Sequence, residues 1–199
     1  MTPSPSSIGT RPATVTLRLR DDRAVRVRPL MRSDREQLIE GFRDLSEDSR
    51  YQRFLSPTAR LSGRQVTYLT EMDYIDHFAW GVESTDGAGI AIARYVRTGR
   101  DVAEAAFTIN DAFHGCGLGW RLFQALAMVA AEHGIRRFEM TMLAGNTSME
   151  RLARKAGAVF EQPDGGTTRA EAALPPEIWS DLPGAAELLC LAAAAARAG

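Results

Sequence analysis

The sequence predicts an α/β fold of the α+β type, with one central, mixed but mostly antiparallel sheet and helices on both faces. Three observations predict it. Residues 77–109 show the pattern of three strands joined by tight turns, which is typical of an antiparallel meander. A glycine-rich segment and a long amphipathic helix, residues 118–133, follow the meander. Beyond this helix the pattern alternates strand, helix and strand, and one sheet covered on both faces is the economical packing.

The individual elements follow from the same signals. Alternating apolar and polar residues predict strands. Apolar residues at helical spacing after a Ser, Asp or Asn cap predict helices. The expected strands are residues 14–20, 24–28, 77–83, 90–96, 102–109, 136–143, 158–161 and 168–174, and the expected helices are about residues 34–45, 49–55, 62–72, 118–133, 146–156 and 184–198.

Length and composition predict one domain with two flanking segments. The 199 residues suffice for a sizeable core. Residues 1–13 are rich in Ser, Pro and Thr, lack the apolar stretch of a signal peptide, and are expected to form a disordered tail. Residues 14–175 would be the domain, and residues 176–199 a helical extension that packs on that domain or on a second subunit. We expect a monomer or a homodimer.

Charge and cysteine content argue against several classes of partner. The 24 basic and 25 acidic residues nearly cancel, so no basic field is available to bind nucleic acid or an anionic membrane. The longest apolar region, residues 192–196, is far shorter than the roughly 20 residues that span a bilayer. Cys116 and Cys190 do not make a disulfide framework, which fits a cytoplasmic location. The three histidines lack metal-ligand spacing, so no metal is expected.

The glycine-rich segment is the run His114-Gly115-Cys116-Gly117-Leu118-Gly119, which opens the long helix. Glycines let the backbone approach a phosphate without a Cβ in the way. The free amides and the positive end of the helix dipole then bind the anion. We therefore expect the amides from Gly115 to Trp120 to bind a pyrophosphate.

Three other interpretations compete for this segment. A dinucleotide fold needs a third glycine where this chain has Trp120, and it places the motif in an opening βαβ unit, although Glu139 has the spacing of its ribose-binding acid. A P-loop is excluded because no Gly-Lys-Ser/Thr sequence follows. An ordinary flexible loop would gain nothing from three alternate glycines, which cost conformational entropy.

On these residues the chain resembles the GNAT (Gcn5-related N-acetyltransferase) superfamily. Its cofactor motif, Gln/Arg-x-x-Gly-x-Gly/Ala between a strand and a long helix, is similar to residues 114–119, with His114 in place of Gln or Arg. A second family element, Asn before a helix that ends in Ala-Gly-hydrophobic, is similar to Asn146 and residues 156–158. The resemblance covers about residues 24–175 and implies the GNAT fold, with acetyl-CoA as co-substrate.

A closer resemblance is to the acyltransferase domains of bacterial Pat-type protein lysine acetyltransferases. Residues 49–54, 91–95 and 103–107 carry it. It implies an N-acetyltransferase that transfers an acetyl group from acetyl-CoA to a primary amine, with a protein lysine as the acceptor. Two alternatives stay open from the residues: acetylation of a small-molecule amine, and a non-catalytic regulatory module that only binds acyl-CoA.

The resemblance also implies where acetyl-CoA binds. In GNAT folds the strand at residues 102–109 splays from the next strand, which frees its backbone for the pantetheine arm and for the developing oxyanion. Asn146 would contact the same arm, cap its helix, or do both. Many members carry a Tyr that protonates the leaving thiolate. The matching position here is Leu152, so that acid is absent, replaced by water or supplied by another Tyr. The expected cofactor-binding residues are Phe107, Thr108, Ile109, His114, Gly115, Cys116, Gly117, Leu118, Gly119, Trp120 and Asn146.

Glu104 is the candidate catalytic base. Strand alternation places Glu104, Ala106 and Thr108 on one face of the strand, just upstream of the cofactor-binding segment. An acid in an otherwise apolar strand is costly unless it is partnered or useful, and partial burial would make it a better base. The alternative is a solvated glutamate or an ion pair with an arginine such as Arg94. Cys116 lies at a helix N-terminus, which favours a nucleophile, but its place inside the phosphate loop argues against that role.

Overall fold

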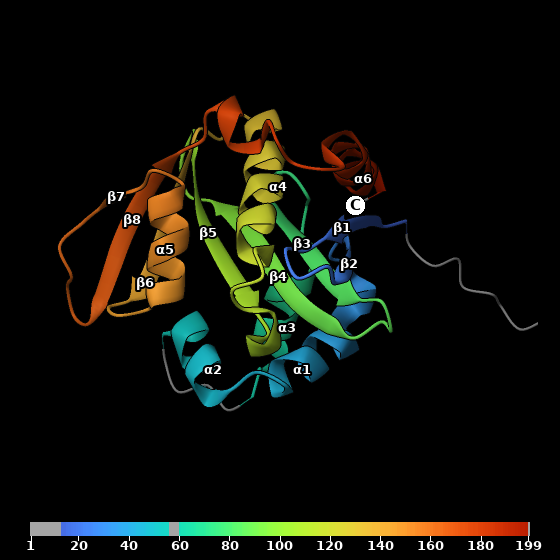
Figure 1. Ribbon diagram of the computed structural model, residues 1–199, viewed down its shortest axis with the longest axis horizontal. Coiled ribbons are helices and arrows are strands. Elements are labelled where there is room, and N and C mark those ends of the chain that lie inside the picture. The colour runs from blue at the N-terminus through green and yellow to red at the C-terminus, as the bar shows by residue number, and fades with distance from the viewer. Residues whose placement is uncertain (1–12, 56–59, 199) are drawn as a thin grey trace, which may run out of the picture.

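One open, eight-stranded sheet forms the centre of the computed structural model, which describes residues 13–55 and 60–198. Its strands lie in the order β1-β2-β3-β4-β5-β6-β8-β7 (Figure 1). All neighbours pair antiparallel except β5 and β6. The strands are β1 (Val15–Arg18), β2 (Ala24–Pro29), β3 (His77–Ser84), β4 (Gly89–Arg97), β5 (Val102–Ile109), β6 (Arg137–Leu143), β7 (Val159–Phe160) and β8 (Thr167–Ala173).

Helices cover both faces of the sheet, with α1 and α3 on one face and α4 and α5 on the other (Figure 1). The predicted mixed, mostly antiparallel sheet with two covered faces is confirmed. The tail predicted for residues 1–13 lies outside the described residues, apart from Ala13. The helices are α1 (Arg35–Arg43), α2 (Glu47–Phe54), α3 (Gly63–Thr70), α4 (Leu118–Glu132), α5 (Thr147–Lys155) and α6 (Ala185–Ala198).

Three single-turn 3-10 helices were not predicted from the sequence. They are Arg32–Asp34, Asp111–Phe113 and Pro176–Trp179. Each is three or four residues long, which is too short to show a hydrophobic period. The turn at Asp111–Phe113 matters most for function, because it connects β5 to the glycine loop.

The core lies between the sheet and α4. Phe78, Trp80 and Phe138 come from the strands and are fully buried, and Phe123 comes from α4. Phe123 meets Phe138 edge-on, with ring centroids 5.8 Å apart. Edge-to-face contacts of this kind fix the helix against the sheet, and with it the position of the helix N-terminus.

A buried ion pair anchors α1 to the sheet. The two Nη atoms of Arg28 on β2 donate to the Oδ atoms of Asp34 at 2.7 and 2.9 Å. Asp34 also accepts from the backbone N–H of Met31 at 2.7 Å. Both partners are about nine-tenths buried, at 8% exposure each. The pair therefore holds the start of α1 at a defined place beside the sheet.

The C-terminal extension packs on the domain, since α6 contacts β2 and α4. Leu182 and Leu188 are buried in the main core. The Nε2 atom of Gln124, in the middle of α4, donates to the carbonyl of Ile178 at 2.7 Å and to Asp181 at 2.6 Å. This explains why a polar residue occurs on an otherwise apolar, buried stretch of α4.

We predict that Asp34→Ala lowers the free energy of unfolding by roughly 3–5 kcal/mol, because it leaves the Arg28 guanidinium buried without its partner. Urea denaturation measures the change. Arg32→Ala is the control: its pair with Glu71 is exposed, so the loss should stay below about 1 kcal/mol. Equal losses in the two variants would contradict the anchoring role of Asp34.

Candidate active site

Strands β5 and β6 separate partway along their length. Their parallel pairing covers only three positions, from Val102 opposite Arg137 to Glu104 opposite Glu139. On its other side β5 stays paired with β4 as far as Ile109. The backbone of residues 105–109 therefore has no strand partner on the β6 side, and unpaired backbone groups of this kind bind strongly to a polar ligand. The splay expected from the family resemblance is present.

A cleft of about 350 Å³ occupies this gap. It brings together nine of the predicted cofactor-binding residues from β5, the glycine loop and α5. These residues are Phe107, Thr108, Ile109, His114, Gly115, Gly117, Gly119, Trp120 and Asn146. The cleft thus joins a free strand edge to a helix N-terminus, as a long substrate with an amide-bearing arm and a pyrophosphate requires.

Two of the loop glycines have backbone conformations that require glycine. Gly115 has φ +75° and Gly117 has φ +90°, both in the left-handed region. A Cβ on Gly117 would also lie 3.2 Å from the side chain of Arg20. Gly119 serves another purpose: its Cβ would lie 3.3 Å from Ile109, so glycine lets α4 approach β5 closely.

His114 and Asn146 take part in the local hydrogen bonding of the cleft. The Nε2 atom of His114 lies 3.0 Å from the carbonyl oxygen of Ile109, and the side chain is exposed. His114 therefore fastens the loop to the end of β5. Asn146 caps α5, since its Oδ1 accepts from the N–H of Met149 at 3.0 Å. It also lines the cleft, so the cap role is present and a substrate contact stays geometrically open.

Cys116 and Leu118 do not line the cleft with their side chains. Cys116 is buried and its Sγ donates to the carbonyl of Phe113 at 2.9 Å. Leu118 is fully buried in the core. For these two residues only a backbone contact with the cofactor stays a prediction. The burial of Cys116 also argues against a nucleophilic role, because a reactive thiol must be accessible.

Basic side chains from two distant segments line the cleft and were not predicted from the sequence. Arg20 follows the first strand, and Arg151 and Lys155 lie on α5. The Nζ of Lys155 is 4.2 Å from the ring centroid of Trp120. Burial, and then the nearby charge of Arg20, lower the pKa of Lys155. Such a group suits phosphates, but no local pattern in the sequence links these positions.

Helix α2 forms the wall of the cleft opposite α5. Ser49, Gln52 and Arg53 of this helix line it. The Ser49 hydroxyl and the N–H of Ser46 donate to Asp111, in the turn after β5. These hydrogen bonds connect the start of α2 to the end of β5, the strand whose backbone is unpaired on the β6 side. The stretch 49–54, which carried part of the family resemblance, thus lies at the site.

Glu104 is exposed, which corrects the expectation of partial burial. It lies at the last paired position of β5, directly before the splay, and faces Glu139 of β6 in register. The carboxylate is therefore open to solvent. Its charge acts on Arg53 of α2, whereas the sequence suggested Arg94 as the ion-pair alternative. The role as a base stays a prediction.

No group of three or more His, Cys, Asp or Glu residues suited to hold a metal ion is found among residues 13–55 and 60–198. Within the same described part of the chain, no helix is long and apolar enough to cross a membrane.

An open mixed sheet with a splayed strand, a glycine loop at a helix N-terminus and a basic cleft is the arrangement that the family resemblance implied. A family model described as "Acetyltransferase (GNAT) domain" matches residues 24–159. The chain belongs to this GNAT acetyltransferase family.

Relatives with known names agree with this assignment. The chain is 37% identical over 156 residues to Acetyltransferase Pat of Mycolicibacterium smegmatis, covering 75% of this chain and 46% of Pat. It therefore spans less than half the length of that relative. It is 32% identical over 154 residues to Acetyltransferase PA5475 of Pseudomonas aeruginosa, covering 75% of this chain and 83% of the relative.

The crystal structure of the GNAT domain of S. lividans PAT superposes on this chain with a TM-score of 0.77. The two are 34% identical, and the match covers 81% of this chain and 97% of that domain. The overall fold described above is thus similar to that of a Pat GNAT domain.

We predict that Gly117→Ala raises the Kd for acetyl-CoA at least about tenfold. The added Cβ is strained at this positive φ and pushes against the Arg20 side chain, which packs on Gly117. Calorimetric titration measures the affinity. Gly134→Ala is the matched control, since Gly134 also has a positive φ, +79°, but has open space around it and lies at the other end of α4. An unchanged Kd in Gly117→Ala would contradict the assignment of the loop.

Proposed function

We propose that this enzyme transfers an acetyl group from acetyl-CoA to the side-chain amine of a protein lysine. The observation that carries the proposal is the unpaired edge of β5 at residues 105–109, next to the glycine loop. This edge offers donors and acceptors to the amide-bearing arm of acetyl-CoA, and one N–H to the oxyanion that develops at the thioester carbonyl. The phosphates would then lie at Gly115 to Trp120, with Arg20 and Lys155 nearby.

The side of the sheet opposite α4 suits a cationic acceptor. Glu104, Glu139 and Glu171 are neighbours across β5, β6 and β8 and are all exposed. Glu171 is paired with Arg137 at 3.5 Å, so Glu104 and Glu139 are the carboxylates of this face that would attract an ammonium group. The likeness to a protein named Acetyltransferase Pat supports a protein lysine as the acceptor.

Glu104 is our candidate for the group that removes the proton from the acceptor ammonium. It lies at the point where β5 leaves β6, so an amine that attacks the thioester from the open face passes this carboxylate. Its exposure means that a water molecule can carry the proton onward to solvent. Leu152 lines the cleft at the position where many GNAT enzymes carry a Tyr, so this position supplies no acid for the thiolate.

We predict that Glu104→Gln lowers kcat by about 100-fold or more, the usual range for a lost general base, and leaves the Kd for acetyl-CoA nearly unchanged. Steady-state kinetics and calorimetry measure the two quantities. Glu139→Gln is the matched control, because it removes an exposed carboxylate at the neighbouring register position. If both variants lose the same modest activity, the row acts only by attraction and Glu104 is not the base.

We predict that the wild-type enzyme with acetyl-CoA acetylates lysine side chains in a cell lysate, and that Glu104→Gln does so far more slowly. Mass spectrometry of acetyl-lysine peptides measures the products, and a panel of small amines is assayed in parallel. Turnover confined to small amines would move the acceptor to the small-molecule class. Binding of acetyl-CoA without turnover on any acceptor would favour a regulatory module.

A further inference from the structure

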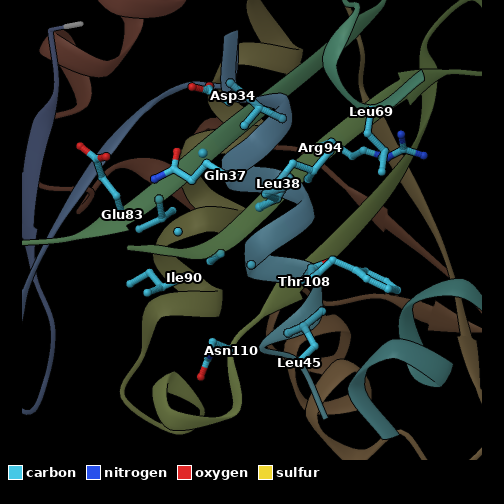
Figure 2. Close-up of a pocket in the computed structure, with 18 of the residues that line it drawn as sticks. Asp34, Gln37, Leu38, Leu45, Leu69, Glu83, Ile90, Arg94, Thr108 and Asn110 are labelled. Carbon is cyan, nitrogen blue, oxygen red and sulfur yellow. The ribbon is translucent and has the colours of Figure 1, made fainter. Parts of the chain in front are cut away.

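A narrow cavity of about 80 Å³ runs between α1 and the sheet, next to the cofactor cleft (Figure 2). Ala106 and Thr108 of β5 line both spaces. They belong to the stretch of β5 that has no partner on the β6 side, where the proposed acyl-transfer site holds the thioester carbonyl. The cavity therefore begins beside the carbonyl carbon that reacts.

The side chains of Ala106 and Thr108 point to the face of the sheet that α1 covers. Ala106 lies opposite Arg94 of β4 and Thr108 lies opposite Ile92, and residues directly opposite in an antiparallel pair share a face. Phe107, between them, points to the other face, toward α4. The side chain that Ala106 contributes to the wall between the two spaces is a single methyl group, so an acyl chain that leaves the carbonyl on this face meets the cavity at once.

The middle of the cavity is apolar. Leu38 of α1, Leu45 just after this helix, Leu69 of α3 and Ile92 of β4 line it. Figure 2 shows Leu38 beside the middle of α1 and Leu45 at its C-terminal end. Leu38 and Leu69 are buried and form a cluster against which Ile92 packs. A space with such a lining favours hydrocarbon over water.

Charged side chains at the far end of the cavity are already paired within the protein. Arg28 forms an ion pair with Asp34 at 2.7 Å. Glu83 accepts from Nε of Arg26 at 3.0 Å. These pairs satisfy the charges at that end, and the space in front of them suits an uncharged ligand.

The volume of the cavity limits the length of the chain that fits. A water molecule takes up about 30 Å³ in the liquid, so about 80 Å³ holds two or three groups of similar size. A butyryl group has three carbon atoms beyond its carbonyl, whereas an acetyl group has one. The cavity therefore has room for a butyryl chain but is too small for an octanoyl chain, which has seven.

The acyl chain of the donor fits the surroundings better than the acceptor does. A protein lysine reaches the thioester with its ammonium first, and the backbone that carries it is too large for this cavity. The exposed Glu104 and Glu139 attract that ammonium from the solvent side. Arg94 lines the cavity and repels a cation, but its charge does not oppose an uncharged chain.

We propose that this cavity is an acyl-chain subsite, so that the enzyme also uses donors with short straight chains, up to butyryl-CoA. The proposal rests on the acyl-transfer function proposed above. The amine nitrogen bonds to the thioester carbonyl carbon and the C–S bond breaks. Of the two protons that the ammonium loses, one leaves on the coenzyme A thiol and one passes to solvent, while the carbon atoms of the chain are unchanged.

The test compares acetyl-, butyryl- and octanoyl-CoA. Each methylene group that is buried favours binding by about fourfold, so we expect the wild-type Kd for butyryl-CoA to be about tenfold below that for acetyl-CoA. Calorimetry measures the Kd values without an acceptor. With a lysine acceptor from the lysate assay above, kcat/KM for butyryl-CoA should stay within about tenfold of that for acetyl-CoA, and kcat/KM for octanoyl-CoA should be at least about 100-fold lower.

Variants of Ile92 change the space in opposite directions. Ile92→Phe fills the cavity and should raise the Kd for butyryl-CoA about tenfold, while the Kd for acetyl-CoA changes less than about threefold. Ile92→Ala enlarges the cavity and should improve the affinity for hexanoyl-CoA relative to butyryl-CoA. Ile39→Phe is the matched control, because Ile39 packs against the same apolar cluster as Ile92 without lining the cavity. It should leave all these ratios unchanged.

Equal losses for acetyl-CoA and butyryl-CoA in Ile92→Phe would overturn the subsite. So would a wild-type enzyme that binds octanoyl-CoA as tightly as butyryl-CoA, because the chain then lies outside the cavity. If Ile92→Phe does not fold, as circular dichroism would show, Ile92→Ala decides, and an unchanged preference in it contradicts the proposal. If no donor is turned over on any acceptor, the proposed function fails, while the Kd ratios still decide the subsite.

Discussion

The site depends on the point at which β5 and β6 stop pairing. Three residues of parallel pairing hold the strands together, and after Glu104 they part. Each backbone group beyond that point is a strong hydrogen-bonding group that needs a partner, which the fold does not supply on that side. The same divergence creates the cleft and exposes its polar edge. A straight, fully paired sheet would leave no place for an extended substrate.

The long helix α4 turns this opening into a directed binding site. Its contacts with the sheet, Phe123 on Phe138 and Gly119 on Ile109, fix where its N-terminus lies. The free amides of that end then point to the same cleft as the β5 edge. The burial of α4 on both sides, by the sheet and by the C-terminal extension, keeps this direction constant. Structural burial is thus one use of this helix, and the anion binding proposed above would be the second.

Charge is distributed differently on the two sides of the splay. Arg20, Arg151 and Lys155 line the side where the phosphates would lie. The exposed glutamates of β5, β6 and β8 mark the opposite, open face. Arg94 of β4 pairs with Ala106 of β5 and therefore lies on the same face of the sheet as Glu104. Under the proposed function, the anionic donor would be attracted to the first side and the cationic acceptor to the second.

The sequence by itself determined the order and type of the elements and the position of the glycine loop. Hydrophobic period, caps and glycines are local signals, and the strand Val102–Ile109 was predicted with its observed bounds. Single turns such as Asp111–Phe113 were too short to leave a period. The family pattern supplied the residues at the splay, from Phe107 to Ile109, and the cap at Asn146.

Only the tertiary structure decided what lies beside these residues. Arg20, Arg53 and Lys155 belong to segments far apart in the chain, and no local pattern brings them together. The exposure of Glu104 could not be read from strand alternation, because alternation gives the face of a strand but not whether another element covers it. The unpaired Nη1 of Arg94 follows from packing in the same way. Local chemistry determines the elements, and the long-range packing of the sheet determines which side chains meet.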